Sequence, residues 1–195
     1  MHGLINRSLQ CFLRDTYGVP TWVEVARNSN LGFDSFEALH TYDDALTEAV
    51  INAASQHLAR SREAVLEDLG NYLVSHPNVE GLRRLLRFGG VTFVDFLHSL
   101  EDLSGRGRMA VPDIDLPDLT LFSDDDDHFL LLCGNSIDGS GYVMLGLLRA
   151  MADDYGTLVL LEHQGTKERA EVISIKVLEQ GFAAGRRFEL AARVG

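Results

Sequence analysis

The spacing of apolar residues changes once along this chain, and that change restricts the possible folds more than any other feature. Up to about residue 110, apolar side chains recur every three or four residues, as Leu9, Phe12 and Leu13 do. This period is typical of amphipathic helices. Beyond Pro112 the chain carries short apolar runs on both sides of one helical segment at 141–155. Helices followed by a strand–strand–helix–strand–strand unit predict an α+β fold with an antiparallel sheet.

Capping and breaking residues set the predicted ends of the helices. Ser61 can cap a helix that ends before Pro77, because the residue before a proline disfavours helical angles. A later helix is predicted to begin near Thr92 and to end at Gly105.

The strands are predicted at 119–121, 129–132, 157–163 and 170–177. The acidic run 124–127 is expected to form the turn of the first hairpin, and Gly165 the turn of the second. Four consecutive aspartates do not converge on one metal ion, so no metal site is predicted there. A short apolar segment at 188–192 ends the pattern.

The charge balance excludes several classes of partner. The chain has 17 Lys plus Arg and 29 Asp plus Glu, which gives a formal net charge of −12. Binding to nucleic acid or to an anionic membrane requires clustered basic residues, so neither is expected. No apolar run reaches the roughly 18 residues of a membrane span, and the first residues lack a signal-peptide pattern. Cys11 and Cys133 are far apart, which favours reduced thiols in a cytoplasmic protein.

No catalytic motif is present in the sequence. It contains no glycine-rich phosphate loop, no G-x-S-x-G, no H-E-x-x-H and no C-x-x-C. The seven histidines are scattered and none pair at metal-ligand spacing. We therefore predict that the chain is not an enzyme, because no cluster of acid, base and nucleophile is evident.

Several short segments nevertheless occur in an order that matches one known family. They are Met-His-Gly-Leu-Ile-Asn at 1–6, Tyr-Gly at 17–18, Leu-Gly-Asn-Tyr-Leu at 69–73, Phe-Leu-His-Ser-Leu-Glu-Asp-Leu at 96–103, Leu-Pro at 116–117 and Met-Leu-Gly-Leu-Leu at 144–148. Through them the chain resembles the H-NOX (haem nitric oxide/oxygen binding, HNOB) family over residues 1 to about 177. The resemblance implies about seven helices and a four-stranded antiparallel sheet with haem between them.

The same resemblance implies gas sensing rather than catalysis. Stand-alone bacterial members of the family signal to a protein partner, usually a histidine kinase or a cyclic-di-GMP enzyme. We therefore expect a single domain over 1–195, with a helical subdomain at 1–60, a larger subdomain with the sheet at 61–177, and a tail at 178–195.

Two departures from the family concern haem directly. The family's iron ligand is a histidine that follows the leucine corresponding to Leu103, and here that position is Ser104. A serine hydroxyl is a poor iron ligand. The family's Tyr-x-Ser-x-Arg motif, which binds the haem propionates, falls on Cys133, Gly134, Asn135, Ser136 and Ile137. The sequence has no arginine at 109–148, so the charge-assisted bonds to the propionates are lost.

The resemblance also assigns residues to the pocket. Its lining is expected to include Leu4, Ile5, Tyr72, Leu97, Leu100, Ser104, Cys133, Leu145 and Leu148. Ordinary core packing explains the apolar positions equally well. Tyr72 could donate a hydrogen bond to a bound gas, or it could be a core tyrosine whose hydroxyl is bonded elsewhere.

Three side chains are candidates to replace the missing iron ligand: His76, His98 and Cys133. His98 lies six residues before Ser104 on one predicted helix, which turns it about 120° away and onto the polar face. We therefore expect His98 to be a surface histidine. His76 ends the helix before Pro77, and the Cys133 thiolate has no positive neighbour to favour it.

Three hypotheses follow. The first is a regulatory module of the H-NOX fold with a degenerate or altered haem site, acting through a protein partner. The second is a haem-based sensor of NO or a related gas with a non-standard iron ligand. The third is an enzyme in the vacated pocket. The basic helix around Arg83, Arg84 and Arg87 is a candidate partner surface in this acidic chain.

Overall fold

The computed structural model describes residues 1–114, 116–134 and 138–186. The helices are α1 (Gly3–Tyr17), α2 (Val19–Asn28), α3 (Asp44–Leu58), α4 (Arg62–Ser75), α5 (Glu80–Arg87), α6 (Phe93–His98), α7 (Leu103–Ala110) and α8 (Ser140–Tyr155). Two 3₁₀ turns, η1 (Pro77–Val79) and η2 (Ser99–Asp102), lie between them. The strands are β1 (Asp118–Ser123), β2 (His128–Gly134), β3 (Leu158–Lys167) and β4 (Ala170–Glu179). The segment predicted at 188–192 lies outside the described residues.

The first four helices begin at side-chain caps or at a glycine. His2 caps α1, and Asp43 and Ser61 cap α3 and α4 by accepting from backbone N–H groups two or three residues on. Gly18, at φ +92°, turns the chain between α1 and α2, a conformation that suits glycine. The cap and the end of α4 agree with the prediction from Ser61 and Pro77.

The helix predicted from Thr92 to Gly105 is longer and less regular than expected. It begins at Thr92, in a capping box with Asp95, but after α6 the chain tightens into η2 before α7 resumes. The end at Gly105 was wrong, because α7 continues to Ala110. It stops where Val111, the residue before Pro112, takes up an extended conformation.

The four strands form one antiparallel sheet in the order β1-β2-β4-β3, which confirms the predicted fold class. The acidic run at 124–127 connects β1 to β2, as predicted. The second hairpin does not turn at Gly165. Its turn is at Glu168 and Arg169, both with positive φ, whereas Gly165 lies in an irregularity of the pairing between His163 and Thr166.

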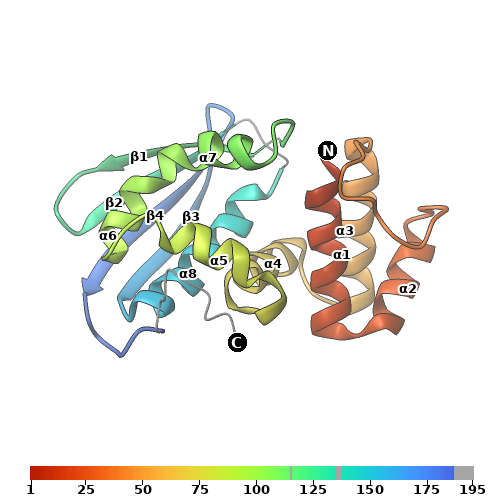
Figure 1. Ribbon diagram of the computed structural model, residues 1–195, viewed down its shortest axis with the longest axis horizontal. Helices are drawn as coiled ribbons and strands as arrows, with labels where there is room; N and C mark the ends of the chain where they lie inside the picture. Colours follow the sequence, from red (N-terminus) through yellow and green to blue (C-terminus); the bar gives the residue numbers. More distant parts are fainter. Residues whose placement is uncertain (115, 135–137, 187–195) are drawn as a thin grey trace.

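Two separate hydrophobic cores result from this arrangement. The helical core joins α1, α2, α3 and the first part of α4, and the sheet core joins the inner face of the sheet to α6 and α8. In Figure 1, α1, α2 and α3 lie together at one end of the molecule, and the sheet with α6 and α8 lies at the other. Helix α4 contributes to both cores, so the predicted division at residue 60 stays a prediction.

Helices α4 and α8 connect the two cores by an unusually close crossing. A Cβ atom on Gly70 would lie 1.9 Å from the carbonyl oxygen of Val143, and one on Gly146 would lie 1.9 Å from that of Glu67. Any larger side chain at either glycine would force the two backbones apart. This crossing therefore sets how α8 meets the helical core.

Candidate functional site

Five of the predicted pocket residues lie together in the sheet core. Leu97 and Leu100 come from α6 and η2, Cys133 from the inner face of β2, and Leu145 and Leu148 from α8. The other predicted residues do not join them. Leu4 and Ile5 are half-buried on α1 and belong to neither core.

Tyr72 belongs to the helical core, which corrects the expectation that it shares one lining with the five residues above. Its ring packs 5.6 Å from that of Phe12, and its hydroxyl donates to Asp15 at 2.6 Å. Burial raises the pKa of Tyr72, and the Asp15 carboxylate raises it further. Tyr72 is therefore a core tyrosine whose hydroxyl is bonded to Asp15, which is the second of the two interpretations considered for it.

Ser104 is buried, and its hydroxyl is used inside the protein. The Oγ atom donates a 2.6 Å hydrogen bond to the carbonyl oxygen of Pro117. This bond ties α7 to the residue just before β1. A structural link therefore occupies the position to which the resemblance assigns the iron ligand.

Cys133 is 2% exposed on the inner face of β2, opposite Leu119 of β1 and Glu171 of β4. Burial raises the pKa of this thiol to about 12, and the nearby Glu171 carboxylate adds to the effect. The thiol is therefore protonated at neutral pH.

The two candidate histidines lie outside the sheet core. His98 is exposed, as predicted, and its ring edge approaches Phe129 at 5.8 Å between centroids. The 3₁₀ turn η2 separates it from Ser104, so the continuous-helix geometry assumed for this pair does not hold. His76 stacks on Tyr72 at 4.8 Å and accepts a hydrogen bond from the backbone of Asn78.

A buried carboxylate that the sequence analysis missed lies at the start of α8. Glu171 of β4 accepts from the backbone N–H groups of Gly139 at 2.8 Å and Gly141 at 3.2 Å. Nε2 of His163 lies 2.8 Å from the same carboxylate, and Nδ1 of His163 accepts from the N–H of Gly165. The assignment of Nε2 as the donor follows from that second bond. The sequence does contain a signal that could have revealed this buried carboxylate. Glu171 occupies an inward position of the predicted strand at 170–177, and the next inward residues, Ile173 and Ile175, are apolar.

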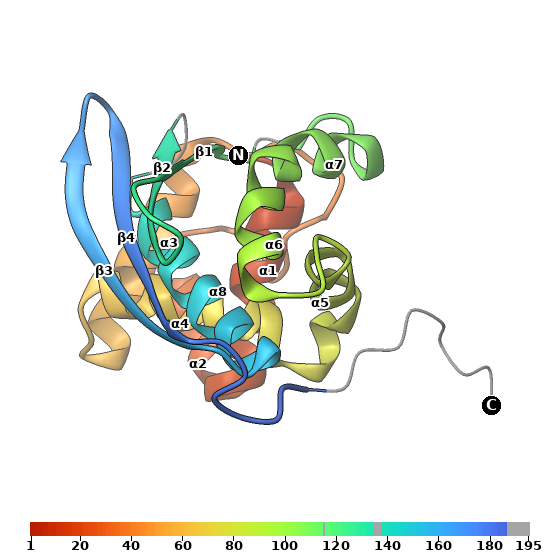
Figure 2. The same cartoon turned by 90° about the vertical axis from the view of Figure 1, so that its left-hand side faces the viewer.

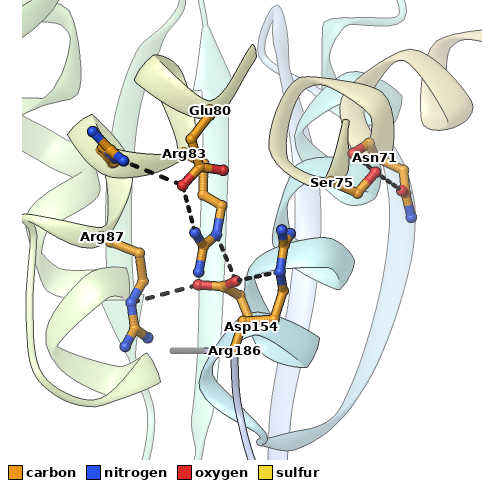
Figure 3. Close-up of polar contacts among 8 residues, drawn as sticks. Asn71, Ser75, Glu80, Arg83, Arg87, Asp154 and Arg186 are labelled. Atoms are coloured by element: carbon orange, nitrogen blue, oxygen red, sulfur yellow. Dashed lines mark hydrogen bonds and ion pairs between the residues drawn. The ribbon is translucent and has the colours of Figure 1, made fainter. Parts of the chain in front are cut away.

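A second missed carboxylate lies at the other end of α8. Asp154 is 1% exposed, and Arg83 of α5 donates to it at 2.7 Å. Arg87 and Arg186 approach the same carboxylate at 3.5 and 3.8 Å, as Figure 3 shows. The guanidinium of Arg87 also lies 3.7 Å from the centre of the Tyr155 ring.

This arrangement corrects the interpretation of the basic helix as a partner surface. Arg83 and Arg87 of α5 point inward to Asp154, and their side chains are buried or nearly so. Arg84 alone of the three is exposed, and it pairs with Glu80. Two of the three arginines of α5 therefore pair with a buried carboxylate and do not form a surface for a docking partner.

Two cavities lie away from the predicted pocket residues. One of about 430 Å³ is lined by α1, α2 and the segment at 32–35, and one of about 230 Å³ lies beside Glu171, His163 and Tyr142. Within the described ranges, no group of three His, Cys, Asp or Glu side chains is placed to hold a metal ion. Nor is any helix there long and apolar enough to cross a membrane.

The comparison with protein families identifies this architecture. The model of the haem-NO-binding family, HNOB, matches residues 2–163. The chain belongs to the haem-NO-binding (H-NOX) family. This is a family of haem-based gas sensor domains, and the domain is not itself an enzyme.

Solved structures share the H-NOX fold at low sequence identity. An H-NOX protein from K. algicida in the unliganded Fe(II) state superposes with a TM-score of 0.79 at 15% identity, covering 94% of this chain and 100% of that one. One from S. oneidensis in the Fe(II)NO state gives 0.76 at 14% identity, covering 92% and 100%. These likenesses show the fold, including the sheet and its helices.

Among curated proteins, soluble guanylate cyclase 89Db of Drosophila melanogaster is 26% identical over 168 residues, which is 84% of this chain and 25% of that protein. The chain spans about a quarter of the length of the first curated relatives that it matches.

The residues of this H-NOX domain do not fit haem held in the family's manner. All seven histidines are described, and His2 is the only buried one; its Nδ1 accepts from the N–H of Leu4 at the start of α1. Residues 135–137 of the assigned propionate motif lie outside the described residues. Beside the end of β2 the structure places Glu171, a buried carboxylate that repels a second one. The hydroxyl of Ser104 is bonded to Pro117, so this position offers no ligand to iron.

Proposed function

We propose that this H-NOX domain is a regulatory module that signals through a protein partner and whose haem site has degenerated or changed. The observation that carries the proposal is the hydrogen bond from Ser104 to the carbonyl oxygen of Pro117. A neutral hydroxyl is a poor iron ligand, and this one already satisfies a backbone acceptor. Ser104, at the position assigned to the iron ligand, thus links α7 to the residue just before the first strand.

The partner classes come from the resemblance and from the relatives. Stand-alone family members suggest a histidine kinase or a cyclic-di-GMP enzyme as partner, and the guanylate cyclases among the relatives suggest a nucleotide cyclase. We expect the location to be cytoplasmic. Cys11 packs against the helical core and Cys133 lies in the sheet core, so the two thiols are not placed to form a disulfide with each other.

The alternative is a haem-based NO sensor with a non-standard iron ligand. One observation favours it: Cys133 lies in the same core as Leu97, Leu100, Leu145 and Leu148. Its raised pKa opposes the idea, because a thiol coordinates iron well only after losing its proton.

The test is an absorption spectrum of the protein expressed with haem supplied, with and without NO. We expect no stoichiometric Soret band from the wild-type chain. Ser104→His restores an imidazole at this position and should increase haem retention if room for the group persists. Ser99→His places an imidazole on the preceding turn and serves as the matched control.

A stoichiometric Soret band in the wild-type protein that shifts with NO would contradict the proposal. Cys133→Ala would then decide between the alternative and another ligand. A band lost in that variant identifies the thiolate, and a band retained directs the search to His76 and His98.

A further inference from the structure

The face of the sheet that points away from the helices is unusually apolar. In an antiparallel sheet with one solvated face, the outward residues are normally polar. Here the outward positions of all four strands include large apolar side chains: Phe122 on β1, Leu130 and Leu132 on β2, Leu158 and Leu160 on β3, and Val172 and Leu178 on β4. We call these seven residues the outer apolar face.

The outer apolar face is not part of either core. Phe122, Leu160 and Leu178 are 51%, 51% and 53% exposed. Val172, on a central strand, is only 3% exposed, yet it belongs to neither the sheet core nor the helical core. Figure 2 shows α5, α6, α7 and α8 on one side of the sheet, with β3 and β4 at the margin of the molecule. The helices therefore bury the other side of the sheet, and the outer apolar face points away from them.

The outward positions carry charges of both signs, although the whole chain carries −12; one of them, Asp118 on β1, lies 3.8 Å from its ion-pair partner Arg108 of α7. Glu162 of β3 and Lys176 of β4 point outward among the apolar residues. They are diagonal neighbours, because Lys176 pairs with Leu160 and Glu162 with Ser174 in the strand register. A face with one carboxylate and one ammonium close together complements itself when a copy is turned about a two-fold axis between them.

We infer that the outer apolar face is the contact surface of a symmetric dimer of this chain. A two-fold axis in the plane of the contact places Lys176 opposite the partner subunit's Glu162, and the reciprocal pair forms by symmetry. The leucines and Phe122 of the two copies are then removed from water. Neither a basic nor an acidic partner is favoured by a surface that carries charges of both signs.

The size of the face sets the expected strength of the contact. Four strands about 4.8 Å apart and about seven residues long, at about 3.4 Å each, cover on the order of 450 Å² of plane. Patches of roughly 300–600 Å² on a protein surface are often functional, whereas stable interfaces bury about 800 Å² per partner. We therefore expect a reversible dimer with a micromolar dissociation constant.

The experiment is analytical ultracentrifugation of the whole chain from low micromolar to several hundred micromolar concentration. The wild-type protein should pass from monomer to dimer in this range. Leu160→Ser and Phe122→Ser should each raise the dissociation constant at least tenfold. Leu39→Ser removes a side chain that is 91% exposed far from the sheet and should change nothing. Circular dichroism and the Tm establish that each variant is folded.

The charge pair provides the sharper test. Lys176→Glu and Glu162→Lys should each weaken the dimer, because each brings like charges together across the axis. The double variant, Lys176→Glu with Glu162→Lys, should recover most of the wild-type association. A wild-type chain that stays monomeric at several hundred micromolar, or a dimer that none of these variants affects, would overturn the inference. So would a double variant no better than the single ones.

Discussion

The two ends of helix α8 each hold a buried carboxylate, and they neutralise it in different ways. At the start, Glu171 is held by two backbone N–H groups and His163. At the end, Asp154 is surrounded by the guanidinium groups of Arg83, Arg87 and Arg186. The helix dipole explains the difference, because its N-terminus favours a negative charge and its C-terminus opposes one. Two backbone amides and one imidazole hold Glu171, whereas Asp154 is held by three guanidinium groups.

The comparison also shows what α8 does in this domain. Glu171 connects the start of the helix to β4, and Asp154 connects its end to α5 and to the segment after β4. The backbone N–H of Arg186 also donates to the carbonyl oxygen of Asp154. Both ends of the helix are thus fixed by long-range polar contacts, and its middle is fixed by the close crossing with α4.

The largest expected effect is at the C-terminal end. Asp154→Asn leaves Arg83 buried beside a neutral amide, and breaking a buried pair of this kind costs about 3–5 kcal/mol. Urea unfolding followed by circular dichroism measures the loss. Glu80→Gln removes a half-exposed partner of the same arginine and should cost less than about 1 kcal/mol. Equal effects of the two variants would mean that Asp154 has no special role.

At the N-terminal end the expected effect is smaller. Glu171→Gln keeps the shape but presents an amide N–H₂ group to at least one backbone donor, which leaves that donor unsatisfied. We expect a loss of about 1–3 kcal/mol in the free energy of unfolding. Glu179→Gln, at the exposed end of the same strand, is the control. A loss larger than that of Asp154→Asn would contradict the account based on the helix dipole.

Two substitutions of Tyr155 distinguish the contributions of its hydroxyl and its ring to stability near Asp154. Its hydroxyl donates to the carbonyl oxygen of Gly90 at 2.9 Å, and its ring lies under Arg87. Tyr155→Phe should cost about 1 kcal/mol through the lost hydrogen bond. Tyr155→Leu should cost about 1 kcal/mol more, because it also removes the aromatic face under Arg87 and the ring contacts with Phe93 and Phe96. Equal losses in the two variants would show that these ring contacts add nothing to stability.

A third carboxylate, Asp15, is more exposed than the two at the ends of α8 and extends the comparison to a less buried site. The hydrogen bond from Tyr72 lowers the pKa of Asp15 from its usual 3.8, and Asn78 contributes in the same direction. The stability that this adds is present above that usual value and is lost as the pH falls through the lowered one. Tyr72→Phe should therefore cost about 1 kcal/mol or less at neutral pH and flatten the acid side of the stability profile.

The alkaline side of the same profile provides the check. Because the pKa of Tyr72 is raised in the folded protein, its contribution to stability declines as the pH rises above about 10. Tyr72→Phe removes that decline. Urea midpoints measured between acid and alkaline pH should show both changes, and an unchanged profile would mean that Tyr72 and Asp15 are not coupled.

Local patterns were sufficient for most of the fold. The change of apolar period gave the order of helices and strands, and Ser61 and Pro77 bounded α4 because caps and breakers act within a few residues. The errors were also local. Gly105 does not end a helix when Pro112 lies further on, and Gly165 fits an irregular strand as well as a turn.

The site was less predictable, for a physical reason. The sequence by itself determined the family and the α+β class, and it predicted that Ser104 stands where the family has its histidine. Only the tertiary structure decided that Ser104 binds Pro117, that Tyr72 turns to Asp15 and that the arginines of α5 face Asp154. Arg83 and Asp154 are 71 residues apart, and Gly139 and Glu171 are 32 apart. Buried charges take whichever partners the packing brings within reach, and periodicity along the chain carries no information about distances of that kind.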